Sequence, residues 1–218
     1  MAGFLMTVLR WFFHLRMTIR PIEGQDIEPA ARLLALQFAT REPLTRHLKL
    51  RTEDLMPLFR EHLAFCAREG TGVVAISRSG AMLGVITAED DFAPFVPSPE
   101  VLTPETAQVG RILDAVQVPK TWQSQRARDL FYCDLAAVDP QLADKHVLAA
   151  LTLGIFDHLS RLGFQRGYAK VTNARMVARL RGFERLLSRS IFKELADHAT
   201  EDGTRIVVLG WMLDFYHR

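Results

Sequence analysis

The residues around position 140 follow an order that could bind an anion. An apolar, strand-like run at 131–138 stops at Asp139-Pro140, and a polar stretch at 141–146 precedes an amphipathic pattern that predicts a helix at 147–161. A helix N-terminus offers unpaired N–H groups and the positive end of the helix dipole, and both attract phosphate. The sequence therefore indicates an anion site at the start of this helix.

The same turn has a second interpretation, because it contains no glycine. Glycine would let the backbone come close to a phosphate, but Asp144 and His146 occupy the turn instead. Asp144 is also an ordinary N-cap residue, and its carboxylate would compete with a phosphate for the same N–H groups. Lys145 and His146 would partly offset that negative charge. A plain helix start and an anion site both remain open.

The composition limits the class of protein. The chain has 218 residues, 49% of them apolar and 24% charged, which suits one globular domain with a sizeable core. A formal net charge of +2 does not favour nucleic acid as a partner. Cys66 and Cys133 lie in apolar patterns, which indicates buried thiols in a reducing, cytoplasmic compartment. The seven histidines are scattered, so no metal site is expected.

Residues 1–16 form an apolar, aromatic extension before the domain, which we place at 17–218. The extension is too short to span a bilayer and lacks a signal-peptide cleavage pattern. It could pack on the domain or a partner, rest on a membrane surface, or precede a true start at Met17. We favour the start at Met17.

Hydrophobic periodicity and turn residues predict the order of the elements. The predicted elements are a strand at 17–22, helices that begin at Asp26 and Asp54, strands at 73–77 and 82–88, a short helix at 105–116, a strand at 131–138, a helix at 147–161, a strand at 166–171, a short helix after Asn173, a loop at Gly182-Phe183 and a strand at 205–209. Pro43 is expected to interrupt the first helix, and Pro57 to lie in the first turn of the second. This order predicts an α+β fold, a mixed and largely antiparallel sheet flanked by helices in a single domain.

The order strand, polar turn, helix, strand, Asn173 and Gly182-Phe183 resembles the acyl-CoA-binding half of the GCN5-related N-acetyltransferases. The resemblance covers roughly residues 17–210. It implies that the segments 131–138 and 166–171 are neighbouring parallel strands that splay apart to form a cleft for acetyl-CoA or another acyl-CoA. The implied cofactor-binding residues are Ala137, Val138, Gln141, Asp144, Lys145, His146, Val147 and Asn173.

The segment Phe-Ala-Thr-Arg-Glu-Pro-Leu at 38–44 resembles the arylalkylamine N-acetyltransferase branch of that superfamily. In that branch the glutamate before the proline is the catalytic base, which implies this role for Glu42. A surface glutamate beside a turn is the alternative. Asp134 is a second candidate catalytic residue if its side chain faces the acceptor pocket, and a salt-bridged strand residue if it does not.

One part of the expected chemistry has no evident residue. No tyrosine follows Gly182-Phe183, where many members of the superfamily have a general acid, and Phe192 stands in that region. Tyr132 and Tyr168 flank the expected cofactor strands, and we interpret both as packed sheet residues. The agent that protonates the leaving thiolate is thus not identified by the sequence.

The resemblance implies an acyl-CoA-dependent N-acyltransferase that acts on a small amine by direct transfer with general-base catalysis. The alternative is a protein of the same fold that is non-catalytic, or that takes its acyl group from an acyl-carrier protein. A carrier brings its own phosphopantetheine without a nucleotide, which would explain a turn without glycine. A homodimer, the acceptor amine and the length of the acyl group stay open.

Overall fold

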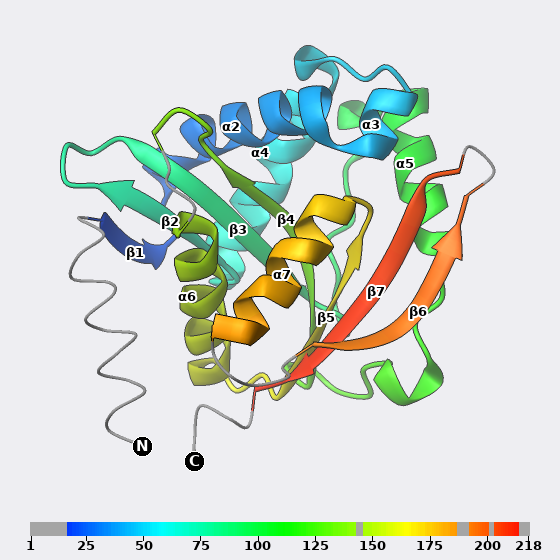
Figure 1. The fold of residues 1–218 in the computed structure, drawn as a ribbon. Helices are drawn as coiled ribbons and strands as arrows, with labels where there is room; N and C mark the ends of the chain where they lie inside the picture. The colour runs from blue at the N-terminus through cyan, green and yellow to red at the C-terminus, as the bar shows by residue number, and fades with distance from the viewer. Residues whose placement is uncertain (1–16, 143–145, 187–191, 201–202, 214–218) are drawn as a thin grey trace.

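A central sheet of seven strands organises the computed structural model, which describes residues 17–142, 146–186, 192–200 and 203–213. The strands are β1 (Met17–Pro21), β2 (Gly72–Ser77), β3 (Met82–Asp90), β4 (Leu130–Val138), β5 (Arg166–Val171), β6 (Lys193–Ala199) and β7 (Arg205–Met212). Their order across the sheet is β1-β2-β3-β4-β5-β7-β6 (Figure 1). Only β4 and β5 pair in parallel among these neighbours. The predicted mixed, largely antiparallel α+β fold is confirmed.

Helices cover both faces of this sheet (Figure 1). They are α2 (Ile27–Arg41), α3 (Pro43–His47), α4 (Thr52–Glu69), α5 (Pro104–Ala115), α6 (Val147–Arg161) and α7 (Ala174–Leu186), with 3-10 turns η1 (Gly24–Asp26), η2 (Pro99–Val101) and η3 (Lys120–Trp122). Alternate residues of β2 face opposite cores, since Val74 packs with α2 and α4 while Val73 packs with α6. No helix in the described part of the chain combines the length and apolar character needed to cross a membrane.

Several predicted boundaries were wrong. Helix α4 begins at Thr52, so Asp54 is its third residue and Pro57 lies in its interior. Asp26 precedes α2 but does not cap it, because its carboxylate accepts the Glu23 N–H at 2.9 Å and pairs with Arg20 at 2.6 Å. Gly182 lies inside α7 and not in a loop.

The sequence also gave no indication of strand β6. Its residues are mostly exposed and polar, and it pairs only with β7 at the edge of the sheet. An edge strand with polar side chains on both faces lacks the apolar alternation on which strand prediction depends.

The contact between β4 and β5 depends on a glycine. A Cβ at Gly167 would lie 2.3 Å from the ring of Phe131, its partner across the parallel ladder. The Phe131 ring is fully buried and packs edge-on against Phe164 and Trp211 at centroid distances of 5.7 Å. Gly167 therefore lets an aromatic core form directly beneath the two strands that open into the cleft.

Candidate active site

A cavity of about 880 Å³ lies where β4 and β5 separate. The two strands pair only from Leu130 to Tyr132 on β4, so the rest of β4 has no hydrogen-bonded neighbour on that side. Ala137 and Val138 of β4 line the cavity, as does Asn173 after β5. The parallel pair and its opening match the expected cleft, and these three predicted residues lie together in it.

Glu42 lies at the helix break that Pro43 was expected to cause. It ends α2 and begins α3, and its carboxylate accepts the N–H groups of Leu44 at 3.0 Å and Thr45 at 2.6 Å. The hydroxyl of Thr172, just after β5, donates a third hydrogen bond at 2.6 Å. Glu42 is half-buried and lines the cavity, so helix capping and a contact with β5 fix its carboxylate at the cavity wall.

A β-bulge turns Asp134 toward the same cavity. Ile86 pairs with Ala136 and Ala88 pairs with Cys133, so two residues of β4 stand opposite the single residue Thr87. The Thr87 hydroxyl bridges the bulge by accepting the Leu135 N–H at 3.3 Å and donating to the Leu135 carbonyl at 3.5 Å. A bulge redirects side chains locally, and here Asp134 faces α4 and lines the cavity.

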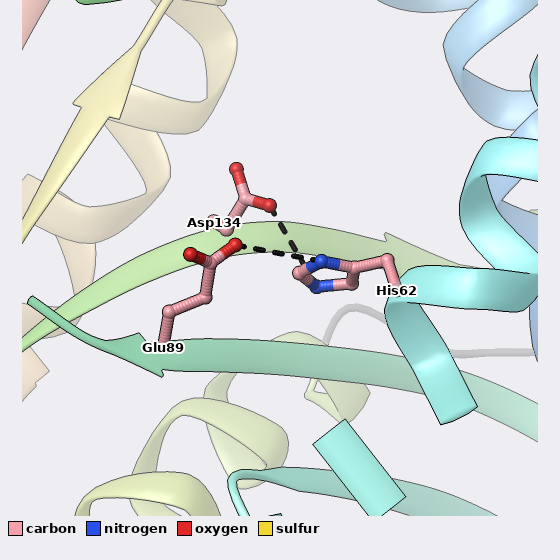
Figure 2. A group of neighbouring side chains, drawn as sticks. All are labelled: His62, Glu89 and Asp134. Atoms are coloured by element: carbon pink, nitrogen blue, oxygen red, sulfur yellow. Dashed lines mark ion pairs between the residues drawn. The ribbon is translucent and has the colours of Figure 1, made fainter. Parts of the chain in front are cut away.

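Two residues that the sequence did not single out as functional lie beside Asp134, as Figure 2 shows. His62 comes from α4, and its Nδ1 is 3.4 Å from Glu89 Oε1 while its Nε2 is 3.7 Å from Asp134 Oδ2. Glu89, at the end of β3, is only 6% exposed and accepts the Phe95 N–H at 2.9 Å. The signal that could have identified them in the sequence is a polar side chain, the imidazole of His62 or the carboxylate of Glu89, within an otherwise apolar face.

Burial changes the ionisation of this group. It raises the pKa of Glu89 to about 9, and the negative charge of Asp134 acts in the same direction. It lowers the pKa of His62 more than the Asp134 carboxylate raises it. Both shifts favour the uncharged forms of the Glu89 carboxyl and the His62 ring.

The residues of the predicted phosphate turn are more exposed than those at the inner end of the cavity. Gln141 is exposed, and its N–H donates to Asp139 Oδ1 at 2.7 Å, as the Leu142 N–H does at 3.0 Å. His146 precedes the first turn of α6 and Val147 is buried in it, but neither lines the cavity. Asp144 and Lys145 lie outside the described residues.

The two sheet tyrosines stack on each other with ring centroids 5.1 Å apart. The Tyr168 hydroxyl donates to Asp91 at 2.6 Å, and burial raises the pKa of Tyr132 well above its ordinary value. Both rings are packed in the sheet, in agreement with our interpretation, although they also border the cavity.

Comparisons with known proteins agree with this geometry at the level of fold. No protein-family model and no curated protein sequence matches the chain. The C-terminal condensation domain of Ebony, solved in complex with β-alanyl-dopamine, has a TM-score of 0.72 at 12% identity, covering 91% of this chain and 99% of that one. Arylalkylamine N-acetyltransferase 2 from Aedes aegypti has a TM-score of 0.70 at 14% identity, covering 90% and 99%. Polyamine N-acetyltransferase from Drosophila melanogaster has a TM-score of 0.63 at 16% identity, with the same coverage.

Identities this low establish the fold alone. The chain therefore has the fold of the GCN5-related N-acetyltransferases, which the order of its elements predicted.

Proposed function

We propose that this protein transfers an acyl group from a thioester donor to the amine of a small molecule. The observation that carries the proposal is a single cavity that contains both the opening between β4 and β5 and two carboxylates, Glu42 and Asp134, from distant parts of the chain. Structures of similar fold are named as N-acetyltransferases of arylalkylamines, agmatine and polyamines, which supports a small amine as the acceptor.

The proposed donor is acetyl-CoA or another acyl-CoA, which acts as a co-substrate. Ala137 and Val138 pair with β3 on one side and leave their other backbone edge free for a pantetheine arm. Asn173 borders the same opening from the end of β5. The proposed phosphate contacts at the start of α6 are Gln141, Asp144, Lys145, His146 and Val147.

Glu42 is the proposed general base. A carboxylate has about four lone-pair directions, and hydrogen bonds from Leu44, Thr45 and Thr172 occupy three of them. The remaining direction, on Oε2, can accept a proton from the acceptor amine directly or through a water molecule. Glu42 takes that proton as the nitrogen bonds to the acyl carbon and the bond from this carbon to sulfur breaks.

The test is an activity assay with acetyl-CoA and a panel of 2-phenylethylamine, agmatine and 1,4-diaminobutane. We expect release of free thiol that depends on the amine, with the amide identified by mass spectrometry. Glu42→Gln should lower kcat by about 10²-fold or more. Glu53→Gln, at an exposed position outside the cavity, is the matched control and should retain full activity. Absence of both thiol release and binding heat with millimolar acetyl-CoA would favour a non-catalytic protein.

A carrier-bound acyl group is the second candidate donor, and the turn before α6 favours it. Asp139 already accepts the N–H groups of Gln141 and Leu142, and the turn has no glycine. One structure of similar fold is a condensation domain with an N-acylated amine bound. If the nucleotide contributes no binding energy, S-acetyl-pantetheine and acetyl-CoA should give the same kcat/KM. A preference of tenfold or more for acetyl-CoA would exclude this candidate.

A further inference from the structure

Acyl transfer from a thioester leaves a basic thiolate that requires a proton. Glu42 is already assigned as the base, and Tyr132 and Tyr168 are packed in the sheet, so the proton donor has still to be identified. We propose that Glu89 and Asp134 form a carboxyl pair that shares one proton and donates it to the departing thiolate. The pair is the general acid of the reaction, with Asp134 as the catalytic residue and Glu89 and His62 as positioning residues. This inference rests on the proposed function.

The position of Asp134 along β4 supports this role. The strands β4 and β5 separate after Tyr132, and Asp134 lies two residues further, at the inner end of the opening. Val138 lies at the outer end, close to the start of α6. A donor arm that enters at α6 and follows Val138 and Ala137 points its sulfur toward Asp134, about 13 Å along the strand.

The charges around the pair require a proton or a cation. His62, Glu89 and Asp134 each offer one atom, and these atoms lie within 4.8 Å of one another. Among the described residues, no lysine or arginine forms an ion pair with either carboxylate. Lys170 is near Asp134, but its Nζ donates to the Leu113 carbonyl at 2.8 Å. Two unneutralised carboxylates at this distance in a buried site are costly, and a shared proton removes that cost.

The elements packed around Glu89 supply no neutralising charge. Beyond burial, the carboxylates of Asp134 from β4 and Asp114 from α5 raise the pKa of Glu89 further, while the Phe95 N–H lowers it. His62 from α4 faces Glu89, and the negative charge of Glu89 raises the pKa values of Cys66 from α4, Tyr132 from β4 and Tyr168 from β5. Burial raises the pKa of Glu89 to about 9, with the negative charge of Asp134 acting in the same direction. Burial also lowers the pKa of His62, so its ring stays neutral. The proton is therefore held by the carboxyl pair.

The neighbours of the pair fix its geometry. His62 approaches both carboxyl groups from α4 (Figure 2), and its Nε2 is 3.1 Å from the Thr87 hydroxyl that also bridges the bulge. The Phe95 N–H holds the other oxygen of Glu89. Glu89 is thus kept inside while the bulge presents Asp134 to the cavity.

The proton transfers balance over one turnover. Glu42 removes one proton from the amine nitrogen, and Asp134 gives the shared proton to sulfur as the carbon–sulfur bond breaks. Sulfur keeps the electron pair of that bond, so a neutral thiol and an amide leave the site. Glu42 returns its proton to solvent, and the carboxyl pair regains one from solvent before the next turnover.

A comparison of leaving groups tests the assignment. An alkyl thiolate is strongly basic and needs protonation, whereas an aryl thiolate leaves without it. We would measure kcat/KM with S-acetyl-pantetheine and with phenyl thioacetate, using the amine that reacts fastest in the panel. Asp134→Asn and Glu89→Gln should lower the rate with the alkyl donor by about 10²-fold and with the aryl donor at least tenfold less. Glu42→Gln should lower both equally, because base catalysis precedes departure of the thiol.

The wild-type protein provides a readout that does not depend on a folded variant. With the alkyl donor, kcat should fall as the pH rises through about 9, when the pair loses its proton. With the aryl donor this fall should be absent.

Three results would decide against parts of the proposal. Equal losses with both donors, together with the same pH dependence, would overturn the general-acid role alone and leave acyl transfer intact. Loss of activity with a chelator, restored by Zn²⁺, would also overturn it, because a cation would then neutralise the pair. Transfer to no amine from acetyl-CoA or from either of these two donors would overturn the proposed function itself.

Discussion

The inner end of the cavity and the start of α6 flank the same proposed donor, yet they are built differently. Glu42 at the cavity wall accepts three hydrogen bonds, and Asp134 at the inner end lies among buried partners from α4 and β3. Before α6, Gln141 is exposed and Leu142 is 58% exposed. If the proposed function holds, this difference implies that the residues around the acyl carbon are more tightly positioned than those around the distal end of the donor.

The largest expected effect is at the inner end. Asp134→Asn keeps the shape of the side chain but removes the carboxylate that is proposed to share a proton with Glu89. Activity with an alkyl thioester should fall by about 10²-fold, while the far-ultraviolet circular dichroism spectrum stays unchanged. If the variant retains more than half of the wild-type rate, the inner end of the cavity is no more important for activity than the turn before α6.

Substitution of a glycine beneath the cavity should affect stability next. Gly167→Ala places a Cβ 2.3 Å from the Phe131 ring, and overpacking of this kind costs about 1–3 kcal/mol in the free energy of unfolding. Gly110→Ala is the matched control, because nothing lies within 4 Å of its added Cβ and alanine favours the interior of α5. Urea denaturation of both variants should show a lower midpoint for Gly167→Ala only.

The carboxyl pair should also make stability depend on pH. The pKa of Glu89 is raised from 4.5 to about 9, so the folded protein holds a proton that the unfolded chain releases in that range. Stability should therefore decrease as the pH rises from about 4.5 to 9, by at most about 1.4 kcal/mol per pH unit. Glu89→Gln should flatten this dependence in thermal melts between pH 5 and pH 9. An unchanged slope would mean that Glu89 is ionised in the folded protein.

The smallest effect is expected at the turn before α6. Replacing Asp144 and His146 together by glycine removes an anion and two side chains from the phosphate path, so acetyl-CoA should bind up to about tenfold more tightly, or 1.4 kcal/mol. Glycine at the N-cap position of α6, which His146 occupies, should cost only about a few tenths of a kcal/mol. Unchanged affinity in a folded double variant, measured by calorimetry, would identify the turn as a plain helix start.

Periodicity and turn residues predicted most of the fold because α6 buries apolar residues at helical spacing and β3 is a largely apolar, continuously buried run. Pro43 also located the helix break at Glu42 correctly. The roles of Glu42 and the cofactor residues came from a resemblance, and they remain proposals.

The partners of Asp134 could not be predicted, because the bulge breaks the alternation of β4. Strict alternation would put Asp134 and Leu135 on opposite faces, whereas Asp134 approaches His62 of α4 and Leu135 packs in the core shared with α2 and α4. His62 and Glu89 are 27 residues apart and meet only through the packing of α4 on β3. Such tertiary contacts leave no local signal in the sequence.

The hydrogen bond from Thr172 to Glu42 joins residues separated by 130 positions. During synthesis on the ribosome, β1 to β3 and helices α2 and α4 emerge first and can pack together, since their contacts are comparatively local. The wall of the cavity at Glu42 is complete only after β5 has left the exit tunnel. A nascent chain that stalls before residue 166 would therefore present the unfinished edge of β4 to chaperones, and the proposed active site would be among the last parts of the protein to form.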